Sequence, residues 1–413
     1  MYMFSKPSLI DCGEKSKSII KSADPSSDRN EDMHLKSINR FFWPILCLIS
    51  LTSAPAFAET EADSANTILI GQSAALSGSS KELGEETVLG IQLYFDQVNA
   101  QGGIYGRKLK LITLDDANQP GRAHDNTIEL VTKKHVTALL GYVGTDTSVA
   151  ALPVFSYYET PFIGAVTGTD LLRVPYNRYV FNTRASFADE AARIVQQLTS
   201  IGIRNIAVFY QSDAHGLDGL EAVNEEMSKL GLSIVARGSI ERTSKDPRSA
   251  VYLINRAKPG AVILFCMSSQ AIPFIQEMRK QGSTAQFYNT SLVGSTALVR
   301  DMGKDSYGLV VSQVAPHPKG TLPIVRDFKR LLEASNNNAS SYGSMEGYLA
   351  ARVLVEGLRR AGKNPTRENL VNALESMGSL DVGGINIKFS PTDHNGGSFV
   401  DLTMIGADGR FLY

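Results

Sequence analysis

A strand–turn–helix pattern occurs twice in succession between residues 137 and 173. The apolar runs 137–143 and 161–166 each end in a short turn rich in glycine and hydroxyl side chains, at 144–148 and 167–170, and a helical pattern follows each turn. Parallel strands place their carboxyl ends at one edge of a sheet, where α/β proteins bind ligands. The repeated pattern therefore predicts a parallel α/β sheet whose two turns face one crevice.

The two turns carry groups suited to an anion. A helix start leaves backbone N–H groups unpaired and holds the positive end of the helix dipole, so a carboxylate binds there favourably. Thr145, Thr167 and Thr169 add hydroxyl groups at these helix starts. Any one of these hydroxyls could instead only cap its own helix. The doubled arrangement favours a small-molecule site.

The rest of the chain alternates strands with helices in two runs, before and after about residue 186. This order predicts two Rossmann-like α/β lobes with parallel sheets flanked by helices. We assign 59–185 plus 316–385 to lobe one, and 186–315 plus 386–413 to lobe two. The helix expected over 342–361 has an apolar face that must cover an existing sheet, and we expect it to return to lobe one. The lobes are then joined by several hinge crossings.

The first 58 residues have the pattern of a leader. A basic stretch precedes the apolar run 41–51, and Ala56, Phe57 and Ala58 form a small-x-small cleavage pattern. The apolar run is shorter than the roughly 20 residues that span a membrane. We predict a signal peptide over 33–58 that is cleaved after Ala58, and hence a periplasmic protein. Residues 1–32 are interpreted as a gene-model extension, the alternative being a real extension before an uncleaved anchor.

Other classes of function find little support. The net charge of −1 does not favour nucleic acid as a partner. The phosphate-binding, hydrolase, zinc-protease and dinucleotide-binding motifs are not found, and no two of the six histidines are spaced as metal ligands. We therefore expect no enzymatic activity, no cofactor and no metal site.

Four stretches, taken in order, resemble the type I periplasmic binding proteins of the Leu/Ile/Val-binding (branched-chain amino acid) family, the substrate-binding proteins of ABC importers. They are 70–120, 139–155, 161–173 and 207–220. The most specific features are the Leu76-Ser77-Gly78 turn, the glycines at 102 and 103, and the Asp115-Asp116 pair. The resemblance implies a periplasmic, two-lobed fold that closes on its ligand and then docks on a membrane permease.

The resemblance also implies a set of ligand-binding residues. In lobe one these are Val143, Gly144, Thr145, Thr167, Gly168 and Thr169, which would hold the ligand carboxylate. In lobe two they are His215, Ser268 or its neighbour Met267, and Ser291. Tyr342, in a polar turn, is either a lid contact or ordinary helix packing.

Ser291 departs from the family pattern, because an acidic residue there normally takes the α-ammonium group of the ligand. A serine cannot neutralise a buried cation, which costs several kcal/mol without a partner. Glu346 or Asp213 could supply the missing charge. The ligand could instead lack an ammonium group, as a carboxylic acid or an amide does.

The sequence thus predicts a secreted solute-binding protein of an ABC importer. It would capture a small carboxylate-bearing ligand, an amino acid or a related acid or amide, in a cleft between the lobes by hinge closure. The alternative is a ligand-sensing subunit that signals to a membrane receptor or kinase without transport.

Overall fold

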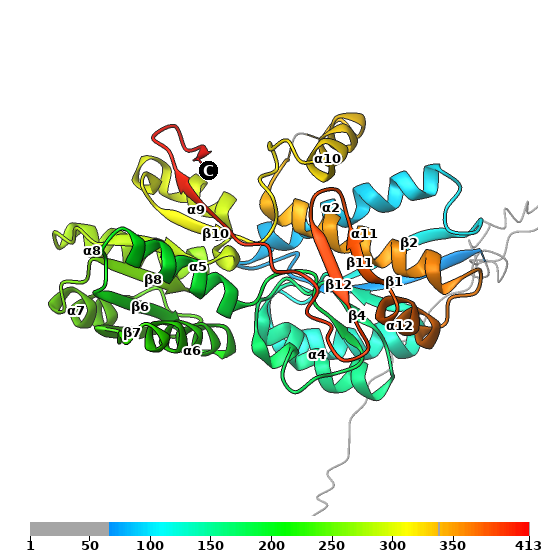
Figure 1. Ribbon diagram of the computed structural model, residues 1–413, viewed down its shortest axis with the longest axis horizontal. Coiled ribbons are helices and arrows are strands. Elements are labelled where there is room, and N and C mark those ends of the chain that lie inside the picture. Colours follow the sequence, from blue (N-terminus) through cyan, green and yellow to red (C-terminus); the bar gives the residue numbers. More distant parts are fainter. Residues whose placement is uncertain (1–65, 338, 413) are drawn as a thin grey trace, which may run out of the picture. The chain divides into compact units, whose positions relative to one another are not determined.

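A computed structural model of the protein describes residues 66–337 and 339–412 (Figure 1), which belong to one compact unit, Ala58–Tyr413. The predicted signal peptide, its cleavage site and the upstream extension lie outside the described residues. Among the described residues, no helix is long and apolar enough to span a membrane.

The first sheet is parallel, with strand order β2-β1-β3-β4-β5. Its strands are β1 (Thr67–Ala74), β2 (Lys108–Asp115), β3 (Ala138–Leu140), β4 (Phe162–Ile163) and β5 (Val180–Phe181). Its connections carry α2 (Lys81–Ala100), α3 (Pro120–Ile128) with the π-helical turn η1 (Glu129–Lys133), α4 (Thr145–Tyr157) and the 3₁₀ turn η2 (Asp170–Leu172). The strand predicted over 137–143 is regular only to Leu140, because Gly141 has a φ of 62° and interrupts the ladder, which resumes as a single parallel bridge between Val143 and Val166.

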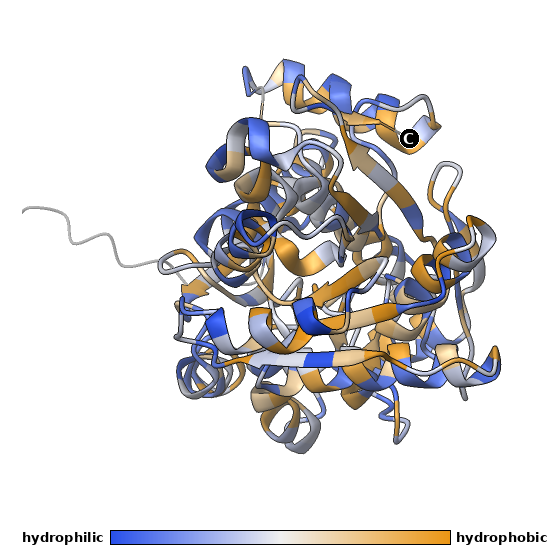
Figure 2. Cartoon of the chain, turned by 90° about the vertical axis from the view of Figure 1, so that its left-hand side faces the viewer, coloured by the Kyte–Doolittle hydropathy of each residue, from blue (hydrophilic) through white to orange (hydrophobic). Residues whose placement is uncertain are grey.

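The second sheet has the order β14-β13-β10-β9-β8-β6-β7. The parallel strands are β6 (Ile206–Gln211), β7 (Ala236–Ile240), β8 (Ala261–Phe265), β9 (Gln286–Asn289) and β10 (Val310–Gln313), and the antiparallel ones β13 (Asp401–Ile405) and β14 (Phe411–Leu412). Helix α5 (Phe187–Ser200) precedes β6. Between the parallel strands run α6 (Ala214–Lys229), α7 (Arg248–Arg256), α8 (Ser268–Lys280), η3 (Ser291–Val293), α9 (Ser295–Met302) and η4 (Gly303–Ser306). In Figure 2 the strands are largely hydrophobic and the helices mix hydrophobic with hydrophilic residues, as expected for sheets covered on both faces.

Helix α11 (Tyr342–Ala361) packs on the first sheet, as predicted, and lies directly against α2. Two glycines allow the close approach. A Cβ atom at Gly90 would lie 1.9 Å from the Ser344 carbonyl oxygen, and one at Gly347 would lie 2.3 Å from that of Thr87. The same part of the chain contributes α10 (Pro323–Ala334), α12 (Arg367–Glu375) and the hairpin of β11 (Gly378–Asp381) with β12 (Asn386–Phe389).

Within the described residues the chain passes three times between the two sheets: after β5, after β10 and after β12. Two crossings run side by side, because Asn182 forms a parallel bridge with Asn395, and its N–H donates to the His394 carbonyl oxygen at 2.9 Å. The predicted architecture of two α/β lobes joined by several crossings is therefore confirmed. The residue limits assigned to the lobes stay a prediction. Strand β12 begins at residue 386, where we assigned the start of the last segment of lobe two, but it pairs with β11 and buries Ile387 and Phe389 in the hydrophobic core of the first lobe.

Candidate functional site

The two glycine- and hydroxyl-rich turns lie side by side. Val143 and Val166 form a parallel bridge, and the hydroxyl oxygens of Thr145 and Thr167 are 2.7 Å apart. Gly144, directly before α4, has a φ of 102°, a conformation that favours glycine. The adjacency predicted from the sequence is thus present, and it places the start of α4 at the carboxyl edge of the first sheet.

Several hydroxyls of these turns are used within their own helices. Thr147 and Ser148 donate to the carbonyl oxygens of Val143 and Gly144, each at 2.7 Å. Thr169 accepts a hydrogen bond from the Leu171 N–H at 3.3 Å, so it caps η2. Thr145 differs, since its hydroxyl reaches the second turn and its residue lines a cavity between the lobes.

The second turn is sealed more tightly than the first. Thr167 and Thr169 are fully buried, and a Cβ atom at Gly168 would lie 2.6 Å from the Phe187 backbone nitrogen. None of these three residues lines the cavity between the lobes. Their contribution to a ligand site therefore stays a prediction, with Thr167 acting through its contact with Thr145.

The cavity that Thr145 lines is called here the inner cavity. It has a volume of about 20 Å³, which is enough for roughly one water molecule. The first lobe contributes Ser80, Leu83, Asn118, Val143, Gly144, Thr145 and Asp146, and the second contributes Gln211, Asp213, His215, Arg242, Met267 and Leu292. The predicted site residues Val143, Gly144, Thr145 and His215, and Met267, the alternative to Ser268, are thus brought together across the lobes.

Arg242 crosses from the second lobe to the start of α4. Its Nη1 lies 3.3 Å from Asp146 Oδ2 and 3.8 Å from Asp213 Oδ2, and its guanidinium also donates to the Asn118 carbonyl oxygen. Burial, and secondly the charge of Asp213, raise the pKa of Asp146, whereas Arg242 lowers it. The sequence offered no motif that would have singled out this arginine.

His215 and Gln211 form the second-lobe end of the inner cavity. His215 is 3% exposed, and burial lowers its pKa to about 4, partly offset by Asp213, so the imidazole is neutral at pH 7. The amide of Gln211, which is 2% exposed, donates to Asp213. The Nε2 of His215 and the Oε1 of Gln211 have no hydrogen-bond partner. Sequence reasoning missed Gln211.

Ser291 and Glu346 meet at a buried arginine that was also missed. Arg184 Nη1 lies 3.0 Å from Glu346 Oε1, Nη2 lies 2.8 Å from Glu190 Oε1, and Nη2 also donates to the Ser291 hydroxyl. Burial raises the pKa of Glu346, and Arg184 opposes that shift. Two residues considered for a ligand ammonium group therefore already contact a cation of the protein.

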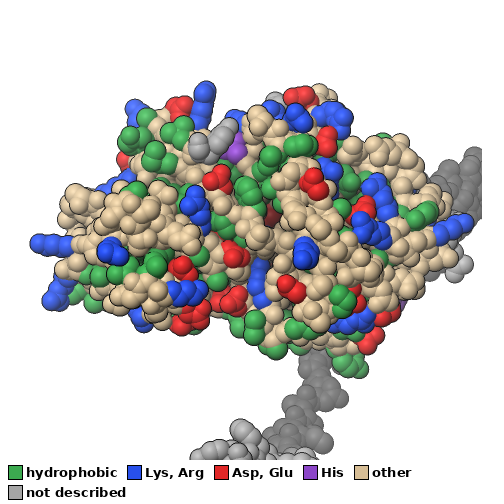
Figure 3. All heavy atoms as spheres, in the orientation of Figure 1, with side chains coloured by type: hydrophobic (Ala, Val, Ile, Leu, Met, Phe, Trp, Pro, Cys, Tyr) green, Lys and Arg blue, Asp and Glu red, His purple; other side chains and the backbone are tan. Residues whose placement is uncertain are grey.

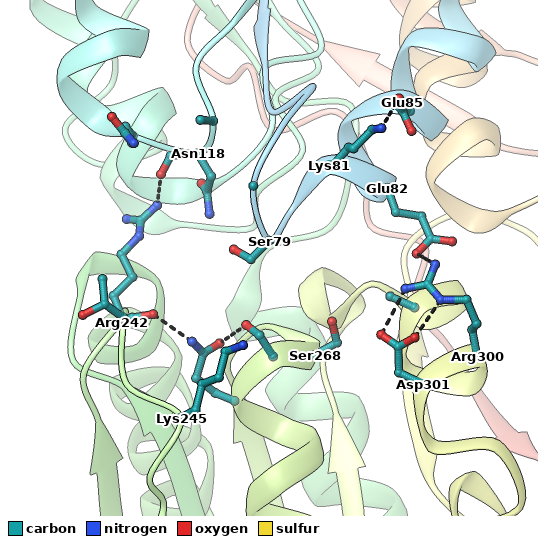
Figure 4. Close-up of a pocket in the computed structure, with 17 residues that line it drawn as sticks. Ser79, Lys81, Glu82, Glu85, Asn118, Arg242, Lys245, Ser268, Arg300 and Asp301 are labelled. Carbon is teal, nitrogen blue, oxygen red and sulfur yellow. Dashed lines mark hydrogen bonds and ion pairs between the residues drawn. The ribbon is translucent and has the colours of Figure 1, made fainter.

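Ser268 and Tyr342 line other parts of the same cleft. Ser268 begins α8 and lines an outer cavity of about 810 Å³ at the mouth between the lobes (Figure 4). Across this mouth Arg300 Nη1 lies 2.6 Å from Glu82 Oε2. Tyr342 lines a small cavity with Glu346 and Glu86, and burial raises the pKa of Glu86 to about 6. Acidic and basic side chains are interspersed on the face shown in Figure 3.

Residues 67–410 match the family model described as periplasmic binding protein. The chain belongs to this family. The family consists of periplasmic solute-binding proteins. Among the described residues of this periplasmic binding protein, no group of three or more His, Cys, Asp or Glu is arranged to hold a metal ion.

Individual relatives agree with this assignment. A structure described as a possible leucine/isoleucine/valine-binding protein from Rhodopirellula baltica has a TM-score of 0.81 at 33% identity, covering 84% of this chain and 97% of that chain. Leu/Ile/Val-binding protein homolog 7 of Brucella melitensis is 23% identical over 370 residues, 84% of this chain and 91% of that protein. An amino acid binding protein of Pseudomonas aeruginosa is 26% identical over 243 residues, which is 58% of this chain and only 64% of that protein. The predicted resemblance is confirmed.

Proposed function

We propose that this protein is the solute-binding component of an ABC importer. It captures a small carboxylate-bearing ligand, an amino acid or a related acid or amide, between its lobes and presents it to a membrane permease. The observation that carries the proposal is Thr145 at the start of α4, whose hydroxyl contacts that of Thr167 and which faces second-lobe side chains across the inner cavity. The names of the Pseudomonas and Brucella relatives support an amino acid as the ligand.

The ligand carboxylate is assigned to the first turn of α4. Because the helix begins at Thr145, the backbone N–H groups of 145–147 have no partner within it. These groups, the Thr145 hydroxyl and the positive end of the helix dipole all favour an anion. The first lobe thus binds the charged end of the ligand, and the second lobe covers the rest.

Capture requires the lobes to move. At about 20 Å³ the inner cavity is too small for an amino acid, so the ligand enters when the lobes are further apart. Opening separates the cross-lobe ion pairs Asp146–Arg242 and Glu82–Arg300. Both pairs are partly exposed, and such pairs contribute little on their own. Contacts with the ligand therefore supply most of the preference for the closed form, which is a population shift.

A thermal-shift screen of amino acids, amides and carboxylic acids tests the proposal. A ligand at a hundred times its dissociation constant raises the free energy of unfolding by roughly 2.7 kcal/mol. Thr145→Val removes the hydroxyl at the site. Thr199→Val makes the same change on α5, where the hydroxyl bonds only carbonyl oxygens of its own helix, those of Val195 and Gln196. The shift should fall in the first variant and persist in the second; equal shifts in both would contradict the assigned site.

A further inference from the structure

Two buried polar atoms at the second-lobe end of the inner cavity lack partners. Gln211 is 98% buried, its amide nitrogen donates to Asp213, and its Oε1 accepts nothing. His215 is 97% buried and its Nε2 is equally unpartnered. Buried polar groups in folded proteins are nearly always hydrogen-bonded, so two such atoms on one cavity indicate that a binding partner supplies the bonds.

The chemistry of the two atoms restricts that partner. An amide oxygen can only accept, so Gln211 requires an O–H or N–H donor. A neutral imidazole nitrogen either donates or accepts, depending on the tautomer. A hydroxyl or a carboxamide satisfies both atoms, whereas a methyl group satisfies neither.

The charges that line the cavity narrow the choice further. Asp146 and Asp213 stand against the single cation Arg242, so a second carboxylate on the ligand would be repelled. Arg242 in turn disfavours a cation beside it. A neutral polar group avoids both repulsions.

We propose that the ligand carries a neutral hydrogen-bond donor on its side group, a hydroxyl or a carboxamide, and that Gln211 and His215 bind this group. The inference rests on the proposed function, in which the carboxylate lies at the start of α4. It makes the preferred ligand an amino acid with a neutral polar side chain, instead of a branched aliphatic one.

Calorimetric titration of the purified protein with two matched pairs tests this specificity. L-threonine and L-valine differ by a hydroxyl in place of a methyl group, and L-asparagine and L-leucine have side chains of similar shape. The polar member of at least one pair should bind about tenfold more tightly or better, because a site with buried hydrogen-bonding groups rejects analogues that leave them unpaired. This comparison needs no variant.

Gln211→Leu removes the acceptor, and His215→Phe keeps the aromatic contacts with Phe187 and Phe265. In each variant, the ratio of the affinity for the polar amino acid to that for its apolar partner should shrink to less than about threefold. The control is Gln196→Leu on the exposed side of α5, which should keep the full ratio.

The outcomes separate the specificity from the function. Equal or tighter binding of valine and leucine would overturn the inference and leave the proposed function standing, with a water molecule serving both buried atoms. A polar preference that survives Gln211→Leu and His215→Phe would also overturn it. If no amino acid binds at millimolar concentration, the proposed amino-acid ligand and this inference both fail.

Discussion

Arg184 and Glu346 form a buried ion pair, with Nη1 and Oε1 3.0 Å apart, that ties the first crossing between the lobes to helix α11. Glu190, on α5 of the second lobe, binds the same guanidinium at 2.8 Å. The arginine is thus shared by both lobes at the hinge. This arrangement joins the two cores and also removes Glu346 from the set of free carboxylates.

Replacing Arg184 by methionine should lower the free energy of unfolding by about 3–5 kcal/mol, because Glu190 and Glu346 lose their buried counter-charge. Urea unfolding measures the change. Arg248→Met is the control, since its pair with Asp246 is exposed, and it should unfold at the same urea concentration as the unmodified protein. Similar losses in both variants would show that the hinge arginine has no special role.

Glu86 should make stability depend on pH. Burial raises its pKa from 4.5 to about 6, so the stability linked to its protonated form is fully present below pH 4.5 and is lost as the pH rises through 6. Glu86→Gln should therefore gain stability relative to the unmodified protein between pH 4.5 and 7, by up to about 2 kcal/mol. Urea unfolding at several pH values measures this, with Glu85→Gln, an exposed neighbour on α2, as the charge-removal control. A difference that is flat with pH would contradict the prediction.

Gly90→Ala should destabilise the first lobe by about 3 kcal/mol, because its methyl group would collide with the Ser344 carbonyl oxygen on α11. The control is Gly121→Ala in α3, where a Cβ atom meets nothing within 4 Å, and this change should be neutral or slightly stabilising. Chemical denaturation of both variants is the measurement. A mild effect at Gly90 would mean that α2 and α11 can move apart.

The ion pair at the mouth of the cleft should matter little for affinity. Arg300 and Glu82 are 2.6 Å apart, but their side chains are 59% and 30% exposed, and exposed pairs contribute about 0–1 kcal/mol. Arg300→Gln should therefore weaken the binding of the best amino acid by no more than about fivefold. Titration calorimetry measures the affinity of the variant. A hundredfold loss of affinity would place the ligand in the outer cavity instead.

Local sequence patterns predicted much of the fold. The apolar run 261–267 favours a strand, which the structure has at Ala261–Phe265, and the helix expected over 342–361 is present as Tyr342–Ala361, because strand and helix periodicities are local properties. The sequence pattern also favours a helix over 123–134, but this helix begins at Pro120 and ends in the π-helical turn Glu129–Lys133. Helix ends depend on capping and packing, which periodicity does not encode.

The candidate site was only partly predictable. The approach of Thr145 to Thr167 followed from strand order, since adjacent parallel strands end at one edge. The contacts of Arg184 with Glu346, and of Arg242 with Asp146, join residues far apart in the chain, and no local pattern marks them. Gln211 likewise becomes notable only when its oxygen is seen buried and unpartnered.

A crystal structure of the protein with its most strongly stabilising amino acid tests the central claim most directly. The ligand carboxylate is predicted to lie about 2.7–3.2 Å from the backbone N–H groups of 145–147 and from the Thr145 hydroxyl. A carboxylate bound to the second lobe, or a ligand outside the space between the lobes, would contradict it.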